Sequence, residues 1–153
     1  MVASGAGLRY EELAQSLFDV VTQFCLAVPR GRRRYGDLKE VEYLTLSLLR
    51  QHETMIVGDI QRQLGVLPAQ MSRIIRALES RDRPLIHCRI NPQDKRKIDV
   101  CLTPAGEKAL LDYQGSRIGR LVELLRDLPE EDQDDLVLLV EKLGGLLERG
   151  QGG

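Results

Sequence analysis

The sequence is poor in several residue types that mark particular protein classes. Its 153 residues include no tryptophan, two histidines and three cysteines. No apolar run approaches the roughly 20 residues that a membrane-spanning helix needs, so no membrane partner is expected. The odd, sparse cysteines (Cys25, Cys88 and Cys101) favour a reducing interior over a disulfide framework. Residues 1–7 have neither the basic head nor the hydrophobic body of a secretory signal, so we expect a cytoplasmic protein.

The sequence also lacks the motifs of familiar enzyme classes. It contains no phosphate-binding Gly-Lys loop and no paired-histidine motif, so we expect neither an enzyme nor a bound cofactor. His87, Cys88 and Cys101 could approach one another on a hairpin, but three ligands without a clear fourth are weak evidence for a metal. Because free cysteines commonly serve as small buried hydrophobes, we predict no metal site.

Charge is distributed unevenly along a chain whose net charge is only −1. Residues 68–101 contain eight basic and four acidic residues, a balance of +4, whereas residues 123–149 contain nine acidic and three basic residues, a balance of −6. A basic segment in a near-neutral protein indicates one surface suited to phosphates. A solvated surface of mixed charge would give the same pattern, so charge alone leaves both interpretations open.

Helical periodicity dominates between the glycine-rich ends, and we predict a mainly α fold of the α+β class. Gly65 closes a short third helix, and Pro68 suits the first turn of the fourth. Thr103 fits the N-cap of the fifth helix, with Pro104 at its first position. The predicted helices cover residues 8–28, 38–52, 57–64, 68–81, 104–126 and from 129 on, and two β-rich runs, 85–90 and 98–102, form a hairpin with a polar tip.

A short helix, a tight turn, a second helix and a basic hairpin follow one another in the order of a winged helix-turn-helix. Gly65 can adopt the left-handed conformation that a sharp exit from the third helix requires. Glutamine can bridge two edge atoms of adenine and arginine those of guanine, although both residues are also common on solvated helix faces. The predicted DNA-binding residues are Ala69, Gln70, Ser72, Arg73 and Arg76 on the fourth helix, and Asp94, Lys95, Arg96 and Lys97 at the hairpin tip.

The hairpin resembles the wing of the multiple-antibiotic-resistance regulator (MarR) family of winged-helix transcription factors. Residues 94–106, DKRKIDVCLTPAG, are similar to the family's Asp-x-Arg tip followed by alternating apolar residues, Leu-Thr and a small-residue helix start. Residues 72–75 (SRII) and 78–79 (LE) match its recognition-helix pattern, and residues 128–131 (LPEE) match the usual start of its last helix. The likeness covers about residues 8–147, with the motifs in the family's order and spacing.

The resemblance implies a homodimer that binds a pseudo-palindromic operator in double-stranded DNA. The apolar stripes of the first and last helices agree independently, because a lone lobe could not bury them well. The implied organisation is dimerisation helices at residues 8–36 and 103–149 and a winged helix-turn-helix DNA-binding lobe at 37–102. The glycine-rich ends of the chain predict disordered tails at residues 1–7 and 150–153.

Two departures from the family pattern bear on the half-site. The family commonly ends its recognition helix at a glycine, where this chain has Arg81-Asp82-Arg83-Pro84. It also often begins that helix at serine or threonine, where this chain has Leu67, whose side chain cannot cap. Both departures affect how the helix and the wing would meet DNA rather than the fold.

The three cysteines are candidate redox residues. Some relatives sense oxidants through a cysteine on the first helix, where Cys25 lies, and the arginines that follow could favour its thiolate. With the hairpin centred near Asp94-Lys95, Cys88 and Cys101 come out as opposite residues within disulfide range. Strand alternation argues against that pairing, because it places the two cysteines on different faces.

The main functional hypothesis is a sequence-specific, double-stranded DNA-binding transcriptional regulator, a dimeric repressor released by a small ligand or an oxidant. Family effectors usually bind between the dimerisation helices and the lobe, so the resemblance makes Tyr35 and Tyr43 candidate contacts for a small-molecule effector. The alternative is a winged-helix protein-interaction adaptor that does not bind DNA and uses its acidic last helices. The basic tip, residues 95–97, discriminates between them, because an adaptor has no need of it.

Overall fold

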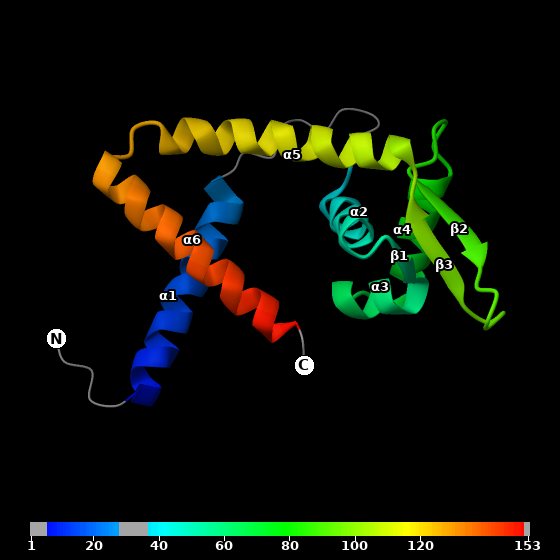
Figure 1. The fold of residues 1–153 in the computed structure, drawn as a ribbon, viewed down its shortest axis with the longest axis horizontal. Coiled ribbons are helices and arrows are strands. Elements are labelled where there is room, and N and C mark those ends of the chain that lie inside the picture. The colour runs from blue at the N-terminus through cyan, green and yellow to red at the C-terminus, as the bar shows by residue number, and fades with distance from the viewer. Residues whose placement is uncertain (1–5, 28–36, 152–153) are drawn as a thin grey trace. The chain divides into compact units, whose positions relative to one another are not determined.

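The structure, a computed structural model, describes residues 6–27 and 37–151 of the chain. Its contacts divide the chain into two compact units (Figure 1). We call residues 31–116 the winged lobe, and residues 1–30 together with 117–153 the helical unit. None of the described helices is long and apolar enough to cross a membrane.

A hydrophobic core lies inside the winged lobe. Helices α2 (Glu40–His52), α3 (Val57–Leu64) and α4 (Pro68–Glu79) contribute to it, together with a small sheet and the start of α5 (Pro104–Leu125). Full burial of an aliphatic side chain contributes roughly 1.5–3 kcal/mol, so this cluster is the main source of the lobe's stability. Its fully buried members are Leu46, Leu49, Ile60, Met71, Leu78, Ile86, Val100 and Leu110.

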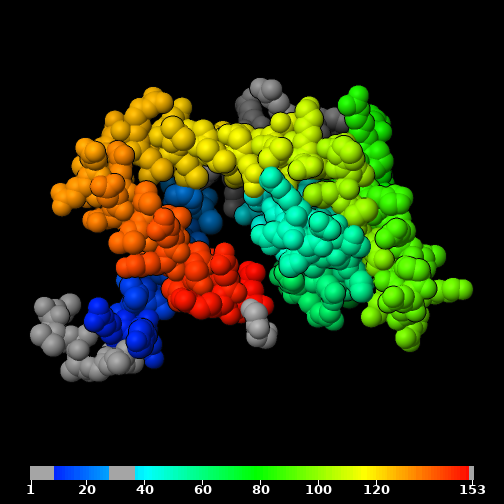
Figure 2. All heavy atoms as spheres, viewed as in Figure 1, coloured from blue at the N-terminus to red at the C-terminus, as the bar shows by residue number. Residues whose placement is uncertain are grey.

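The sheet has three antiparallel strands in the order β1–β3–β2. The predicted hairpin is present as β2 (Ile86–Ile90) and β3 (Ile98–Leu102). The sequence does not predict β1 (Thr54–Ile56), in which Met55 pairs with Val100. Three residues are too few to show alternation, and this strand forms because β3 offers it a ladder of hydrogen bonds. In the space-filling view, the β2–β3 hairpin projects from the body of the lobe (Figure 2).

Helix α5 begins as predicted, with Thr103 as its N-cap. The Thr103 hydroxyl accepts a hydrogen bond from the Gly106 N–H at 3.0 Å and donates one to the Pro84 carbonyl at 2.6 Å. Because Gly106 and Leu110 are buried, the first turns of α5 belong to the core of the winged lobe. The boundary between the two units therefore lies inside α5, whereas the lobe expected from the sequence ends at residue 102.

The helical unit contains α1 (Ala6–Ala27), the second half of α5 and α6 (Glu130–Gly150). Residues 6, 7 and 150 are helical, although the glycine-rich ends of the sequence predict disordered tails there. Alanine at the first position favours a helix, and terminal residues are the least predictable part of any helix. Residues 28–36, which include Tyr35, lie outside the described residues.

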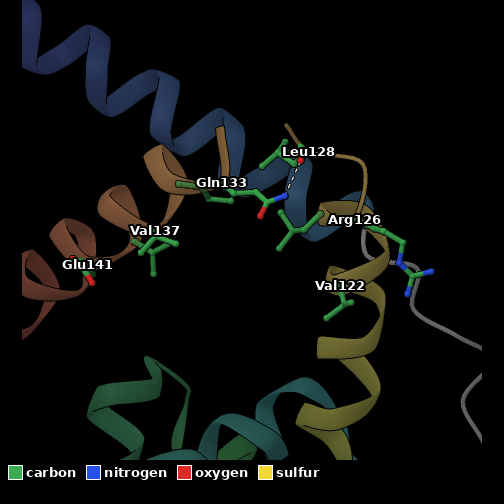
Figure 3. Close-up of a pocket in the computed structure, with 9 residues that line it drawn as sticks. Val122, Arg126, Leu128, Gln133, Val137 and Glu141 are labelled. Atoms are coloured by element: carbon green, nitrogen blue, oxygen red, sulfur yellow. Dashed lines mark hydrogen bonds between the residues drawn. The ribbon is translucent and has the colours of Figure 1, made fainter. Parts of the chain in front are cut away.

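Apolar side chains are exposed on the helical unit. An apolar groove of about 580 Å³ lies between the end of α5 and α6 (Figure 3). Val122 and Val137 line it, while the Arg126 guanidinium extends away from it (Figure 3). The Gln133 side-chain amide donates to the Leu128 carbonyl at 2.8 Å and fixes the start of α6. Further exposed apolar residues are Leu13, Leu17, Val20, Val21 and Phe24 in α1, and Leu138, Leu139, Val140, Leu146 and Leu147 in α6.

Candidate nucleic-acid interface

The turn between α3 and α4 has the geometry predicted from Gly65. This glycine has φ +65° and ψ +31°, and its N–H donates to the Gln61 and Arg62 carbonyls at 3.0 and 3.2 Å. These bonds satisfy carbonyls at the end of α3. They require the left-handed conformation of Gly65, which would be strained in a residue with a β-carbon. Three residues separate the two helices, and Pro68 occupies the first position of α4.

Helix α4 has one buried face and one exposed face. Met71, Ile74 and Leu78 are buried, and their spacing of three and four residues places them on one side of the helix. This packing fixes the helix on the lobe and leaves its other side exposed. The side chains predicted to contact DNA from this helix are all exposed: Ala69, Gln70, Ser72, Arg73 and Arg76.

The departures from the family pattern have local structural consequences. Leu67 is the N-cap residue of α4 but makes no side-chain hydrogen bond, and it is 74% exposed. The Arg81 guanidinium lies 3.7 Å from the buried Glu42 carboxylate, so it lowers the cost of burying that charge. Pro84 precedes β2 and removes no donor from the ladder, and its carbonyl accepts the Thr103 hydroxyl.

An ion pair shapes the tip of the wing. Asp94 Oδ1 accepts the backbone N–H of Arg96 at 3.1 Å and its Nε–H at 3.2 Å, and Asp94 Oδ2 lies 3.4 Å from Arg96 Nη2. The Arg96 side chain is 90% exposed and Asp94 only 29%. Since a guanidinium has five N–H donors, Arg96 retains donors for an outside acceptor. Lys95 and Lys97 are also exposed.

The electrostatics of the tip favour the charged form of this pair. Hydrogen bonds from the side chain and backbone of Arg96 hold the pKa of the Asp94 carboxyl below its usual value. Asp94 is therefore ionised throughout the neutral pH range. It balances one of the three cationic side chains of the tip, so the tip as a whole stays basic.

A second hydrogen-bond network lies below the tip. The Asn91 N–H donates to the Lys97 carbonyl at 2.9 Å, and the Lys97 N–H donates to the Asp94 carbonyl at 3.0 Å. Asn91 Oδ1 accepts the backbone N–H groups of Gln93 and Asp94 at 2.9 and 3.0 Å. Asn91 Nδ2 donates to Oδ1 of the buried Asp99 at 2.9 Å. Asn91 is not among the site residues predicted from the sequence; the signal that could have identified it is an asparagine two residues before a backbone donor, as in an Asx-turn.

The cysteine pairing considered from the sequence is wrong. Cys88 lies opposite Val100, and Cys101 lies opposite His87. The register is therefore displaced by one residue, and the two cysteines lie on opposite faces of the sheet. The displacement arises because the paired residues are symmetric about Asp94 itself rather than about the Asp94-Lys95 bond, so that Ile90 lies opposite Ile98. Within the described residues, no group of three His, Cys, Asp or Glu could hold a metal ion.

The cysteines are free and differ in their surroundings. Burial, reinforced by a hydrogen bond with Glu79 and by its negative charge, raises the pKa of the Cys88 thiol to about 12. Because the thiolate is the reactive form, Cys88 is poorly suited to sensing oxidants. Cys25 lies exposed on α1, and its redox role stays a prediction.

Tyr43 takes part in a contact between α2 and α5. Its ring stacks on that of Tyr113 with centroids 4.2 Å apart and an angle of 17° between the rings. Its hydroxyl accepts a hydrogen bond from Gln114 Nε2 at 3.1 Å. The expected contact between Tyr43 and an effector stays a prediction.

These features define a winged helix-turn-helix domain: a glycine-closed turn, a helix with a polar exposed face, and a basic β-hairpin in one compact unit. Residues 38–98, which make up most of the winged lobe, match the model of the MarR family.

Solved structures share this fold over most of the chain. The YusO protein from Bacillus subtilis is 21% identical over 93% of this chain and 99% of its own, with a TM-score of 0.66. The transcriptional regulator Tm0710 from Thermotoga maritima is 20% identical over 91% of this chain and 99% of its own, with a TM-score of 0.67. BpsR from Bordetella bronchiseptica, whose DNA binding is regulated by 6-hydroxynicotinic acid, is 20% identical over 86% of this chain and 98% of its own, with a TM-score of 0.60. A search of curated protein sequences gave no significant match.

Proposed function

We propose that the protein is a dimeric transcriptional regulator that binds double-stranded DNA at specific sequences. The supporting observation is that one compact lobe presents two elements suited to DNA. These are the exposed face of α4, with Gln70 and Arg73, and the basic wing, with Arg96 at its tip. Helix α4 enters the major groove, where these two side chain types distinguish adenine and guanine edges.

The wing enters the minor groove beside that site. The minor groove carries a nearly degenerate hydrogen-bond pattern, so Arg96 senses groove width rather than individual bases. Narrow A·T tracts have the strongest negative potential and therefore bind an arginine best. In this division of roles, α4 selects the central bases of a half-site and the wing favours A·T-rich flanks.

A second copy of the chain completes the binding unit. The apolar faces of α1 and α6 and the groove between α5 and α6 would otherwise leave a large apolar surface in water. Two copies related by a two-fold axis present two α4 helices, which fit half-sites about one helical turn apart, or a small multiple of it. The operator is accordingly pseudo-palindromic.

Regulation acts by changing how the two lobes fit their half-sites. We assign the protein as a repressor that a small ligand or an oxidant releases from DNA, and the ligand-regulated DNA binding of BpsR supports the first of these signals. Such a signal works only through different affinities for the bound and released arrangements. The Tyr43–Tyr113 stack supports a route for it, because it ties α2 of the lobe to α5.

The test begins with selection of bound fragments from genomic DNA, which yields the operator. Affinities of wild type, Arg96→Ala, Gln70→Ala and Arg73→Ala are then measured at fixed salt on the operator and on scrambled DNA. Arg96→Ala should weaken operator binding by roughly 1–3 kcal/mol, mainly at A·T-rich flanks. Gln70→Ala and Arg73→Ala should change which central bases are preferred. Lys108→Ala, which removes one exposed positive charge from α5, is the matched control.

The outcomes separate the two functional hypotheses. If Arg96→Ala and the control Lys108→Ala both bind the operator as tightly as wild type does, the wing does not contact DNA. Absence of any selected fragment would favour the adaptor, which needs no basic tip.

A further inference from the structure

The exposed Arg96 side chain needs an external constraint to keep one orientation. With its side chain 90% exposed, little packing restricts its rotamers, and ordering a long side chain costs entropy. Asp94 supplies the immediate constraint through three hydrogen bonds to Arg96. Asp94 itself lies in a turn, so its position depends on what holds that turn to the strands.

Asn91 makes that connection. Its side-chain oxygen accepts the N–H of Asp94 and its side-chain nitrogen donates to Asp99. Asp99 is 8% exposed on β3, so it is a fixed point in the sheet. A continuous path of hydrogen bonds thus runs from the buried Asp99 through Asn91 and Asp94 to Arg96.

The chemistry of this path requires an amide at position 91. The same side chain must accept from backbone N–H groups and donate to a carboxylate. An aspartate would accept but would place its charge against Asp99, and an aliphatic residue would do neither. We infer that Asn91 is a positioning residue that holds the wing turn on Asp99 and thereby sets the orientation in which Arg96 meets DNA. This inference rests on the proposed DNA-binding function.

Exchanging the hydrogen-bond donor and acceptor between positions 91 and 99 gives a specific test. In Asn91→Asp, the carboxylate at 91 faces the carboxylate of Asp99 and the path breaks. In the double variant Asn91→Asp/Asp99→Asn, the amide at position 99 donates to the carboxylate at position 91, which still accepts the turn N–H groups. The double variant keeps the wild-type net charge. Gln93→Glu adds one negative charge to an exposed wing position whose side chain is not in the path, and controls for repulsion of DNA phosphates.

Affinity is measured on the selected operator with A·T-rich and with G·C-rich flanks. Arg96→Ala should lower the affinity for the operator with A·T-rich flanks about 5- to 150-fold. Asn91→Asp should lower the operator affinity about 3- to 10-fold more than Gln93→Glu does. It should also lose the preference for A·T-rich flanks, as Arg96→Ala does. When Arg96 is already replaced by alanine, Asn91→Asp should lower the affinity no further than Gln93→Glu does in the same background. The double variant should return to within about 2-fold of wild type.

A second measurement needs no DNA. The Arg96 Nε–H resonance in nuclear magnetic resonance spectra should move toward its random-coil position in Asn91→Asp and return in the double variant. If Asn91→Asp lowers affinity equally with and without Arg96, or the double variant restores neither affinity nor the resonance, the inference is wrong while the proposed function stands. If Arg96→Ala itself changes nothing on DNA, the wing contact of the proposed function fails, and with it the role of Asn91 toward DNA.

Discussion

Replacing Gly106 by alanine is expected to destabilise the winged lobe by about 2–4 kcal/mol. A β-carbon on Gly106 would overlap the Leu85 carbonyl oxygen and lie 3.0 Å from Leu102 Cδ2. Leu102 could turn away, but the Leu85 carbonyl also accepts the Thr103 N–H at 3.1 Å. Relieving the overlap therefore moves backbone and breaks the bond that joins the start of α5 to the strand.

This magnitude is the middle of the range of about 1–6 kcal/mol that three effects of the substitution span. Overpacking costs about 1–3 kcal/mol, and a lost buried hydrogen bond costs about 1–3 kcal/mol. The better helix propensity of alanine offsets at most about 1 kcal/mol. At roughly 2–4 °C per kcal/mol for a chain of this length, the melting temperature should fall by about 5–15 °C.

Thermal melts followed by circular dichroism measure this effect. Gly58→Ala is the matched control, because Gly58 lies in α3 of the same lobe and its β-carbon would meet no atom within 4 Å. It should melt at or slightly above the wild-type temperature. If Gly106→Ala melts within about 2 °C of wild type, the close approach of α5 to Leu85 does not constrain the lobe.

Three further predictions concern the thiols, the wing and the assembly. Because its pKa is raised to about 12, Cys88 should resist alkylation by iodoacetamide near pH 8 in the folded protein and should react after unfolding. Mass spectrometry measures the labelling, and a folded protein whose Cys88 is labelled as fast as in the unfolded protein would contradict this prediction. Because Arg96 depresses the pKa of Asp94, their ion pair is present above the usual value of 3.8 and is lost only as pH falls through the lower folded value. The Arg96 Nε–H resonance should therefore keep a constant chemical shift as the pH is lowered from neutral to the pKa of Asp94 in the folded protein. A change in that chemical shift at or above pH 3.8 would be inconsistent with the Asp94–Arg96 ion pair. Leu139→Glu should dissociate the proposed dimer in sedimentation at micromolar concentration and weaken DNA binding, whereas Gln151→Glu, with the same added charge, should remain dimeric. A well-folded wild-type protein that sediments as a monomer at that concentration would refute the proposed dimer.

The helices and the turn between α3 and α4 were predictable because their signals are local. Gly65 closes α3 through bonds to residues three and four positions earlier, and Thr103 caps α5 through a residue three positions later. Apolar spacing likewise identifies the buried face of α4 from its own residues. The exposure of the candidate DNA-contacting side chains on that helix follows directly, since they occupy the remaining positions.

Features that depend on distant partners were not predictable in the same way. Strand β1 has only three residues and pairs with β3, which lies more than forty positions away in sequence. The boundary between the units falls inside α5 because Gly106 and Leu110 pack in the winged lobe, whereas the periodicity of the helix is continuous. Local pattern shows that such residues are small or apolar, but not which surface they meet.

The register of the wing lies between these two cases. Sequence motifs identify Asp94 and Arg96, which are two residues apart, but Asn91 and Asp99 are eight apart and meet only after the hairpin has formed. A one-residue displacement would exchange the faces of β3, so that Asp99 would no longer lie on the side that Asn91 reaches. The same turn that separates Cys88 from Cys101 therefore brings the amide to its carboxylate. In this hairpin, the register that makes a disulfide impossible is the register that fixes the arginine at the tip.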